Sequence, residues 1–287
     1  MKLYNKQTNQ LESFLTDRSQ ATIYFWGALP REVMHLGHAF AYCAADTLLR
    51  YLQLKDVALE YGQIVTNISG SSQQVALADK SRWSRNVIEN MQALHIRLPE
   101  QLWLPAAARP QLDHAACLFS AAASEMALKE YLAKGQPAAP FWLQAGSVTF
   151  AAVNQVLVHD LLQRYSPDAL RIYLAQQHYR DPWQHDEVAL KKASRRALKL
   201  QAALSAASTG RQAINITPIQ NRFTIAMEND LDTAKGIATL LNLADEVLFR
   251  APNGYLLDGA QAALQRMASV FGLQLAGETI AEQIMTS

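Results

Sequence analysis

Two histidines and a glycine are the residues whose types and spacing point most directly to chemistry. They lie in a four-residue run from His35 to His38, with Gly37 between them, where a predicted strand over 20–26 turns into a predicted helix over 38–54. A helix N-terminus offers unpaired N–H groups and a positive dipole end to phosphate. Gly37 would let a base or ribose approach the backbone, and two imidazoles can donate to phosphoryl oxygens. The run predicts a site for ATP or an adenylate, while two capping histidines around a packing glycine remain the alternative.

The elements that must position this run divide the chain into an α/β front and an all-helical back. The helix after residue 165 is predicted to start with Ser166 as N-cap and Pro167 at its first position. The boundary between a nucleotide-binding domain over 1–183 and a helical bundle over 184–287 is predicted near residue 184. Apolar spacing and turn residues predict strands at 20–26, 64–65, 141–143 and 148–150, and helices opening near 35 and covering 74–94, 112–134, parts of 154–180, 186–207, 217–229, 232–250 and 258–271.

Composition and charge indicate which classes of protein the chain can belong to. The chain has 287 residues, half of them hydrophobic, and 26 basic against 25 acidic residues, so its net charge of +1 gives no global field for capturing a polyanion such as DNA or tRNA. Cys43 and Cys117 lie in Ala-rich apolar surroundings, which favours buried free thiols. No apolar run reaches the roughly 20 residues that span a bilayer, and the first residues resemble no secretory signal, so we expect a cytoplasmic protein without membrane contact. Nothing in the sequence predicts the oligomeric state.

The flanks of the histidine run resemble a known signature. Tyr24-Phe25-Trp26-Gly27, followed eight residues after Gly27 by His35-Leu36-Gly37-His38-Ala39, is similar to the first signature of the cysteinyl-tRNA synthetase family. Further matches run along the chain at Leu3-Tyr4-Asn5, Asp46, Arg50-Tyr51-Leu52, Asn67-Ile68-Ser69, Asn154, Asp160-Leu161-Leu162, Tyr165, Pro167, Ala169-Leu170-Arg171, His178-Tyr179-Arg180, Arg222-Phe223, Ala226-Met227, Asp230 and Thr233.

The resemblance implies a fold and a ligand set. The fold would be a Rossmann-type class I synthetase catalytic domain, interrupted by an insertion and followed by an all-α helical bundle, with ATP, its Mg²⁺ and a small amino acid held at the switch point of the sheet. On this basis His35 and His38 are expected to be catalytic, Gly27, His35, Gly37, His38 and Asn154 to bind the nucleotide, and Trp26, Asn67 and Ser69 to line an amino-acid pocket.

The zinc site of the family is not reproduced. The first of its cysteine ligands falls on Trp26, and an indole cannot supply that ligand. Cys117, His114 and Glu125 lie near one another in sequence, but their spacing does not match the later ligands. No metal site and no zinc are therefore expected, which leaves cysteine uncertain as the substrate.

The second family signature, Lys-Met-Ser-Lys-Ser, should lie shortly before Asn154, yet residues 147–153 contain no lysine. Those cations would stabilise the pyrophosphate leaving group, so their loss predicts an adenylation barrier higher by several kcal/mol unless another cation substitutes. Arg31 and His159 are the candidates for that substitution, and a solvated arginine is the alternative reading of Arg31.

The middle and the end of the chain also differ from the family. The insertion, at about 100–150, is reduced, and either 131–136 matches its start or 141–142 matches its end. The tract 67–73 has hydroxyls and amides where the family has acidic residues, which predicts a neutral pocket or none. The chain ends soon after its fourth back helix, so reading of a tRNA anticodon is not expected. A basic face on the first back helix, consisting of Lys191, Lys192, Arg195, Arg196 and Lys199, fits either a phosphate backbone or plain solvation.

Two functions stay open, and with them the question whether the chain is an enzyme. The first is a tRNA-independent amino-acid ligase, similar in logic to the mycothiol cysteine ligase, which activates an amino acid with ATP and transfers it to a small-molecule amine. The second is a non-catalytic, degenerate paralogue that binds an adenylate-like ligand or a protein partner. A tRNA-binding accessory role is a third, smaller alternative.

Overall fold

The computed structural model describes residues 1–14, 19–27, 33–65, 74–75, 85–103, 116–122, 128–129, 133, 139–151 and 155–275. Its central feature is a six-stranded sheet in the order β5-β6-β4-β3-β7-β8, in which every pairing is parallel except that of β5 with β6. The strands are β3 (Gln20–Gly27), β4 (Ala58–Val65), β5 (Gln74–Val75), β6 (Gln101–Trp103), β7 (Cys117–Ser120) and β8 (Phe141–Gln144).

Strand β3 lies at the topological switch of this sheet. From β3 the chain continues to β4 and β6 on one side, and then returns to β7 and β8 on the other. In an open parallel sheet of this order, ligands bind in the crevice outside the carboxyl ends of the two strands where the order reverses. Those ends are Gly27 of β3 and Ser120 of β7, because Ser120 pairs with Trp26, the residue before Gly27.

Two predicted helices are wrong where their residues pair as strands of the sheet. Residues 112–134 were predicted to be helical, but Cys117–Ser120 forms β7 with all four residues buried. Within the predicted helix 74–94, Gln74–Val75 pairs as β5 and the helix α2 covers only Arg85–Ala93. A short continuous apolar run fits a buried strand as well as a buried helix, so periodicity alone could not separate the two at β7.

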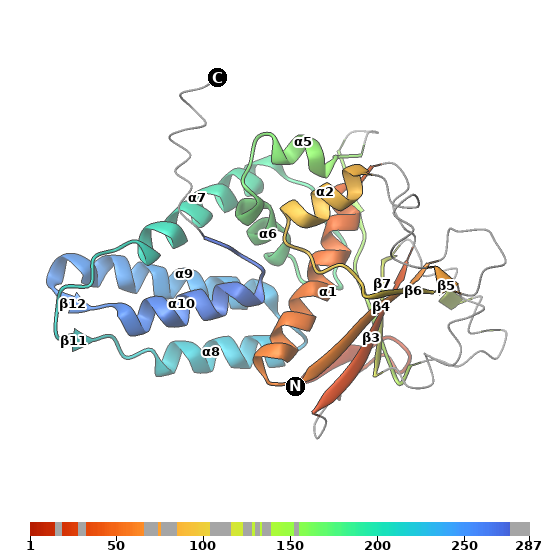
Figure 1. Cartoon of the computed structure of the whole chain (residues 1–287), viewed down its shortest axis with the longest axis horizontal. Helices are drawn as coiled ribbons and strands as arrows, with labels where there is room; N and C mark the ends of the chain where they lie inside the picture. Colours follow the sequence, from red (N-terminus) through yellow and green to blue (C-terminus); the bar gives the residue numbers. More distant parts are fainter. Residues whose placement is uncertain are drawn as a thin grey trace.

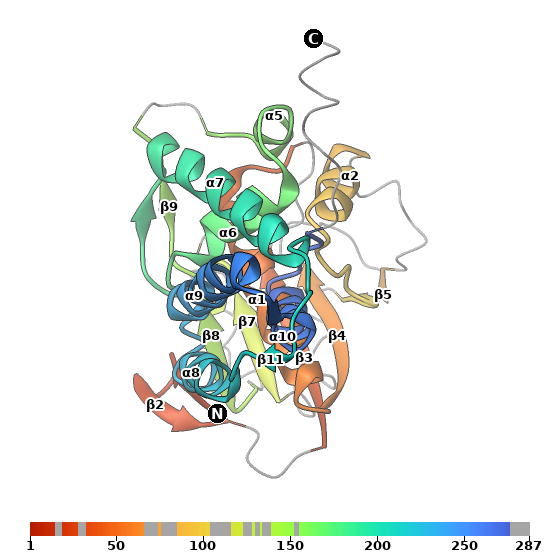
Figure 2. The same cartoon turned by 90° about the vertical axis from the view of Figure 1, so that its left-hand side faces the viewer.

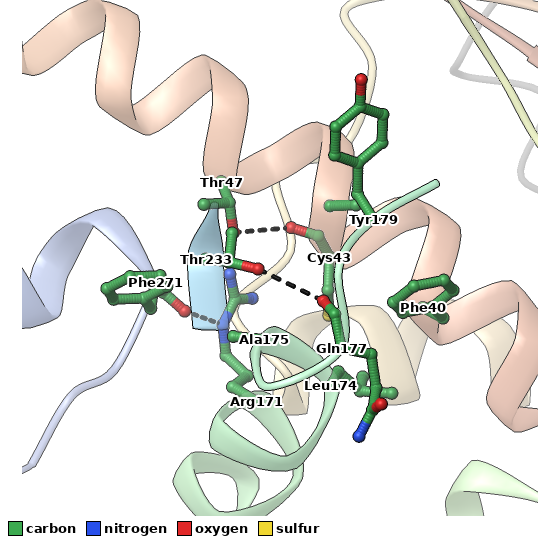
Figure 3. Close-up of a pocket in the computed structure, with 11 residues that line it drawn as sticks. Phe40, Cys43, Thr47, Arg171, Leu174, Ala175, Gln177, Tyr179, Thr233 and Phe271 are labelled. Atoms are coloured by element: carbon green, nitrogen blue, oxygen red, sulfur yellow. Dashed lines mark hydrogen bonds between the residues drawn. The ribbon is translucent and has the colours of Figure 1, made fainter. Parts of the chain in front are cut away.

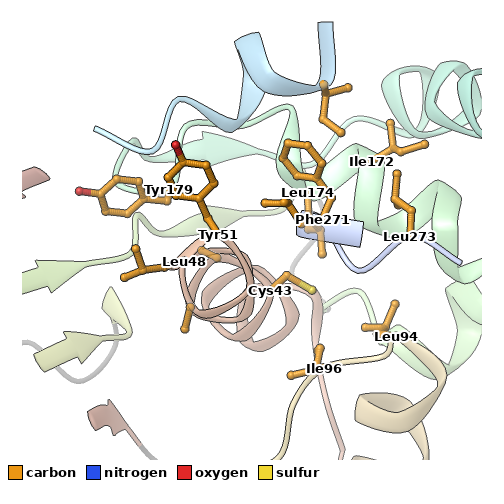
Figure 4. Close-up of a cluster of buried hydrophobic side chains, with 14 of the residues drawn as sticks. Cys43, Leu48, Tyr51, Leu94, Ile96, Ile172, Leu174, Tyr179, Phe271 and Leu273 are labelled. Carbon is orange, nitrogen blue, oxygen red and sulfur yellow. The ribbon is translucent and has the colours of Figure 1, made fainter. Parts of the chain in front are cut away.

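Helix α1 (Leu36–Leu54) begins at the histidine run and is buried on nearly every side. Figures 1 and 2 show why, since α1 lies between the sheet and the helices of the second half of the chain. A helix that is apolar all round is the type expected in such an inner layer. Part of the resulting core is drawn in Figure 4, where side chains of α1 (Cys43, Leu48, Tyr51) meet those of Leu94, Ile96, Ile172, Leu174, Tyr179, Phe271 and Leu273.

The second half of the chain is helical, as predicted. Ser166 caps α6 through its side chain, and Pro167 occupies the first helical position. The helices are α5 (Val158–Leu162), α6 (Pro167–Ala175), α7 (Glu187–Leu204), α8 (Thr217–Glu228), α9 (Thr233–Arg250), the 3₁₀ helix η4 (Ala251–Asn253) and α10 (Asp258–Val270). Three small strand pairs complete the fold: β1 (Lys2–Asn5) with β2 (Gln10–Ser13), β9 (Val148–Thr149) with β10 (Trp183–Gln184), and β11 (Gln212–Ala213) with β12 (Tyr255–Leu256).

A buried arginine joins α1, α6 and the end of α10. The guanidinium of Arg171 is 2.5 Å from the carboxylate of Asp46 and also donates to the carbonyls of Leu94 and Phe271. Figure 3 shows this arginine beside a small cavity of about 10 Å³, also lined by Cys43, a volume that holds about one water molecule. Both partners of the ion pair are about 1% exposed, so the charges depend on each other for compensation.

A second hub ties the first strand to the helical part. Asp230, which is 5% exposed, accepts hydrogen bonds from the Tyr4 amide and from the hydroxyl of Tyr179, and pairs with Arg180 at 2.6 Å. Residues from three parts of the chain that match the family thus meet in one place. No helix in the described part of the chain has the length and apolar character needed to cross a membrane.

Candidate nucleotide-binding site

The histidine run forms the first turn of α1, at the switch end of the sheet. His35 is the N-cap of the helix, and its Nδ1 accepts hydrogen bonds from the amides of Gly37 and His38 at 3.1 and 3.3 Å. An acceptor nitrogen carries no proton, so in the neutral ring the proton resides on Nε2. His35 therefore has one N–H donor, at Nε2, that its capping role does not use.

The expectation of unpaired N–H groups at this helix end is wrong. Besides the two amides that bond to the His35 ring, the Leu36 amide donates to the carbonyl of Val156 at 2.9 Å. The first-turn amides are thus already satisfied by the protein. What the turn offers an anion is the positive end of the α1 dipole and the imidazoles, not a set of free amides.

His38 stacks on His35, with ring centroids 3.6 Å apart and planes at 25°. Burial, and to a smaller extent the neighbouring His35, lowers the pKa of His38 from 6.5 to about 4. Burial also lowers the pKa of His35. Both rings are therefore neutral at pH 7, and the Nδ1 atom of His38 is buried without a hydrogen-bond partner in the described part of the chain. A buried polar atom without a partner is unusual in a folded protein, which marks this turn as a candidate functional site.

Gly37 has a packing role that the sequence did not indicate. A Cβ at this position would lie 3.1 Å from the His35 ring and 3.8 Å from Cβ of Val148. The first contact is tight, so a side chain would press on the ring that caps the helix. The second contact shows that the strand β9 faces the turn.

The segment expected to carry the second signature lies against the first. His35 forms an isolated antiparallel bridge with Leu157, and the amide of Val158 donates to the carbonyl of Met34 at 2.9 Å. Together with Val148 at Gly37, these contacts bring the two stretches, more than a hundred residues apart in sequence, to the same place. The geometry therefore brings together the two stretches that the resemblance relates to one site.

The structure places the remaining predicted residues in different settings. Gly27 ends β3 at the switch point. Trp26 is 1% exposed and lies in an apolar cluster with Trp142, so its role in lining an amino-acid pocket stays a prediction. His159, a candidate cation, is exposed on α5. Four predicted residues, namely Asn67, Ser69, Asn154 and Arg31, lie outside the described residues.

Ser120 is a residue at the switch point that the sequence did not single out. Its hydroxyl accepts the indole N–H of Trp142 at 2.8 Å and is wholly buried beside Trp26. It was missed because its stretch was predicted to be helical. Recognising Cys117–Ser120 as a strand would have placed it at the carboxyl end of that strand.

The cysteines are buried, as predicted. Cys43 and Cys117 are free thiols, and burial raises the pKa of both, that of Cys43 to about 11. A thiolate is the form that ligates zinc, so neither environment favours a metal ligand. Within the described ranges, no group of three or more His, Cys, Asp or Glu residues is arranged to hold a metal ion.

Comparison with known proteins adds independent information. Residues 222–276 match the family model described as DALR domain. Over 162 residues the chain is 30% identical to the cysteine–tRNA ligase of Dehalococcoides mccartyi, and over 111 residues it is 34% identical to that of Dichelobacter nodosus. These matches cover 53% and 36% of this chain but 35% and 24% of the two relatives, so the chain matches about a third or less of each relative's length.

The fold has its own counterparts among solved structures. A methionyl-tRNA synthetase of Mycobacterium tuberculosis in complex with methionyl-adenylate superposes with a TM-score of 0.56, at 9% identity and over 93% of both chains. A second structure of a methionyl-tRNA synthetase from this organism, bound by methionyl-adenylate, gives the same TM-score at 10% identity. At such identities the likeness shows the fold, and the predicted class I fold with a helical second part is confirmed.

Proposed function

The chain is related to the cysteinyl-tRNA synthetases, and from that relationship we propose that it binds ATP or an aminoacyl adenylate at the His35–His38 turn. The observation that carries the proposal is the first turn of α1, where two neutral, stacked imidazoles flank Gly37, and Gly37 faces Val148 of β9. His35 donates its Nε2 proton to a phosphoryl oxygen. His38, beside it, contacts the phosphate region of the ligand, and Gly37 lies against the base or ribose.

The reaction proposed is amino-acid activation without tRNA. The carboxylate of a small amino acid attacks the α-phosphorus of ATP, the bond to the pyrophosphate leaving group breaks, and an aminoacyl adenylate forms. A small-molecule amine then attacks the acyl carbon and releases AMP. Mg²⁺, when bound with ATP, shields the negative charge of its phosphates; the side chains of this chain orient the nucleotide and donate hydrogen bonds to it. Cysteine is one candidate for the amino acid.

Neutral imidazoles suit the binding part of this task. A neutral ring costs less to hold in a buried turn than a charged one, and it still offers one N–H donor. Hydrogen bonds aimed at charge that develops in the transition state are the usual source of such catalysis, and they act most strongly where water is excluded. The half-buried setting of both rings fits that role.

The test is amino-acid-dependent exchange of labelled pyrophosphate into ATP, run over all twenty amino acids. The variants are His38→Ala and, as a control, Gln265→Ala, at an exposed residue of α10. Exchange with one amino acid that persists in the control and is lost in His38→Ala supports the ligase. Exchange that survives in His38→Ala at the wild-type rate would remove the turn from the reaction.

One specific observation favours the second candidate, a non-catalytic paralogue. The segment 147–151, which approaches the turn through Val148, has no basic residue to stabilise a pyrophosphate leaving group. Silence across the amino-acid panel, combined with ATP or adenylate binding that His38→Ala weakens, supports this candidate. The protein would then act by binding an adenylate-like ligand or a partner.

A further inference from the structure

A second hollow opens beyond the carboxyl ends of β7 and β8, apart from the His35–His38 turn. Its volume is about 420 Å³, and none of the described residues that line it is acidic. We call it the Lys6–Arg180 pocket, after its two cations. The side chains that the argument uses belong to Tyr4, Lys6, Gln144, Ser147, Tyr179 and Arg180.

Hydrogen bonds fix the backbone on both sides of the pocket. The amide of Gly146 donates to the carbonyl of Tyr179 at 2.8 Å, and a Cβ on Gly146 would overlap the carbonyl of Asp181, so these two stretches can pack this closely only through a glycine. On the other side, the amide of Lys6 donates to the carbonyl of Trp142 at 2.8 Å. Backbone on both sides of the pocket is thus held by hydrogen bonds.

Arg180 is held in a fixed orientation. Its Nε donates to Asp230 at 2.6 Å, and its guanidinium lies over the ring of Tyr4, 4.6 Å from the centroid. Asp230 is itself fixed by the hydroxyl of Tyr179, at 2.9 Å. The two terminal nitrogens of Arg180 have no hydrogen-bond partner among the described residues, and its side chain is 41% exposed. An oriented fork with free N–H groups is well suited to an oxyanion.

Lys6 is the source of the net positive charge of the pocket. The positive charge of Arg180 is compensated by Asp230, whereas Lys6 forms no ion pair within the part of the chain that the structure describes. The pocket therefore carries an uncompensated positive charge next to a preoriented guanidinium. An anion in it would gain one charge interaction and the hydrogen bonds of the fork.

We propose that the Lys6–Arg180 pocket binds a phosphoryl group or a similar small oxyanion. Lys6 supplies the net charge, the terminal nitrogens of Arg180 supply directed donors, and Ser147 at the rim adds a hydroxyl. The pocket lies at the carboxyl ends of the parallel strands, the end of an open sheet at which ligands bind.

The phosphoryl group can belong to the bound ATP or to a separate molecule, and the distance between the pocket and strand β3 allows both. Gln144 of β8 pairs with Ser120 of β7, which pairs with Trp26 of β3. Two interstrand spacings of about 4.8 Å therefore separate Gln144, which lines the pocket, from Trp26 of β3 by roughly 10 Å. That separation lies within the span of ATP and also leaves room for a separate phosphorylated molecule.

The experiment is calorimetric titration of the whole chain with inorganic pyrophosphate. Lys6→Gln removes the uncompensated charge, and Arg266→Gln, which removes an exposed cation of α10, is the control. We expect pyrophosphate to bind at least about tenfold more weakly to Lys6→Gln than to the wild type, the size typical of a lost charged hydrogen bond, and equally to the control. No binding to the wild type, or equal weakening in both variants, would overturn the proposal.

Three further measurements distinguish the sources and guard against misfolding. If Lys6→Gln weakens ATP binding but not AMP binding, the phosphates of the nucleotide occupy the pocket; if pyrophosphate and ATP bind together, a separate molecule does. Arg180→Lys keeps a cation beside Asp230 but lacks the fork, and should weaken pyrophosphate while keeping the melting temperature near that of the wild type. Pyrophosphate binding needs no turnover, so the pocket is tested even if no amino acid supports exchange.

Discussion

Protonation of the stacked histidines should destabilise the protein in mild acid. His38 is half-buried and stacked on His35, and its pKa falls from 6.5 to about 4 because partial burial disfavours the charged ring and because His35 lies beside it. A group whose folded pKa is lowered contributes stability above its unfolded pKa, and this stability is lost as the pH falls towards the folded value. The window in which His38 acts is therefore about pH 6.5 to 4.

The size of the effect follows from these two values. With a pKa of 6.5 unfolded and about 4 folded, linkage gives a loss of about 2 kcal/mol in the free energy of unfolding between pH 7 and pH 5. This is a large fraction of the stability of a typical domain. His38→Gln cannot take up the proton and should lose less stability over the same interval, by about that amount.

The assay is urea unfolding at a series of pH values, for the wild type, His38→Gln and the control His159→Gln. Other titrating groups, including His35, remain in all three proteins, so the difference between the slopes isolates His38. The control should follow the wild type. A pH slope for His38→Gln equal to that of the wild type would show that His38 is not buried and stacked as described, and would refute the reasoning.

Three further predictions concern the core and the metal. Asp46→Asn leaves the buried charge of Arg171 uncompensated and should lower the free energy of unfolding by about 3–5 kcal/mol, whereas the exposed Asp245→Asn should cost less than about 1 kcal/mol in the same denaturation assay. Gly272 has φ +65° and no room for a Cβ beside the Arg171 guanidinium, so Gly272→Ala should lower the thermal midpoint, and an unchanged midpoint would contradict the packing. Elemental analysis of the purified protein should find no stoichiometric zinc; one zinc per chain would overturn the interpretation of Trp26.

The predictable parts of the fold have local signals. The β-rich run before Gly27 predicted β3, the apolar spacing after His35 predicted α1, and Ser166 with Pro167 predicted the start of α6. Each of these depends on residues that are close in sequence. The helices of the second half of the chain were predicted for the same reason.

The missed parts depend on contacts between distant residues. β7 is a strand because its apolar residues pair with β3 and β8 on both sides, and no local period shows that. The side chain of His35 turns back to cap its own helix, which removes the free amides expected there. Asp230 matched the family in sequence, but its bonds to Tyr4 and Arg180 span 226 and 50 residues, so its bridging role appears only in the folded chain.

The central claim is that the first turn of α1 binds the nucleotide, and a crystal structure of the protein grown with ATP tests it most directly. The account predicts phosphate density within hydrogen-bond distance of Nε2 of His35, with the base or ribose against Gly37 and near Val148. Density for the nucleotide elsewhere, or a turn without ligand at saturating ATP, would contradict it.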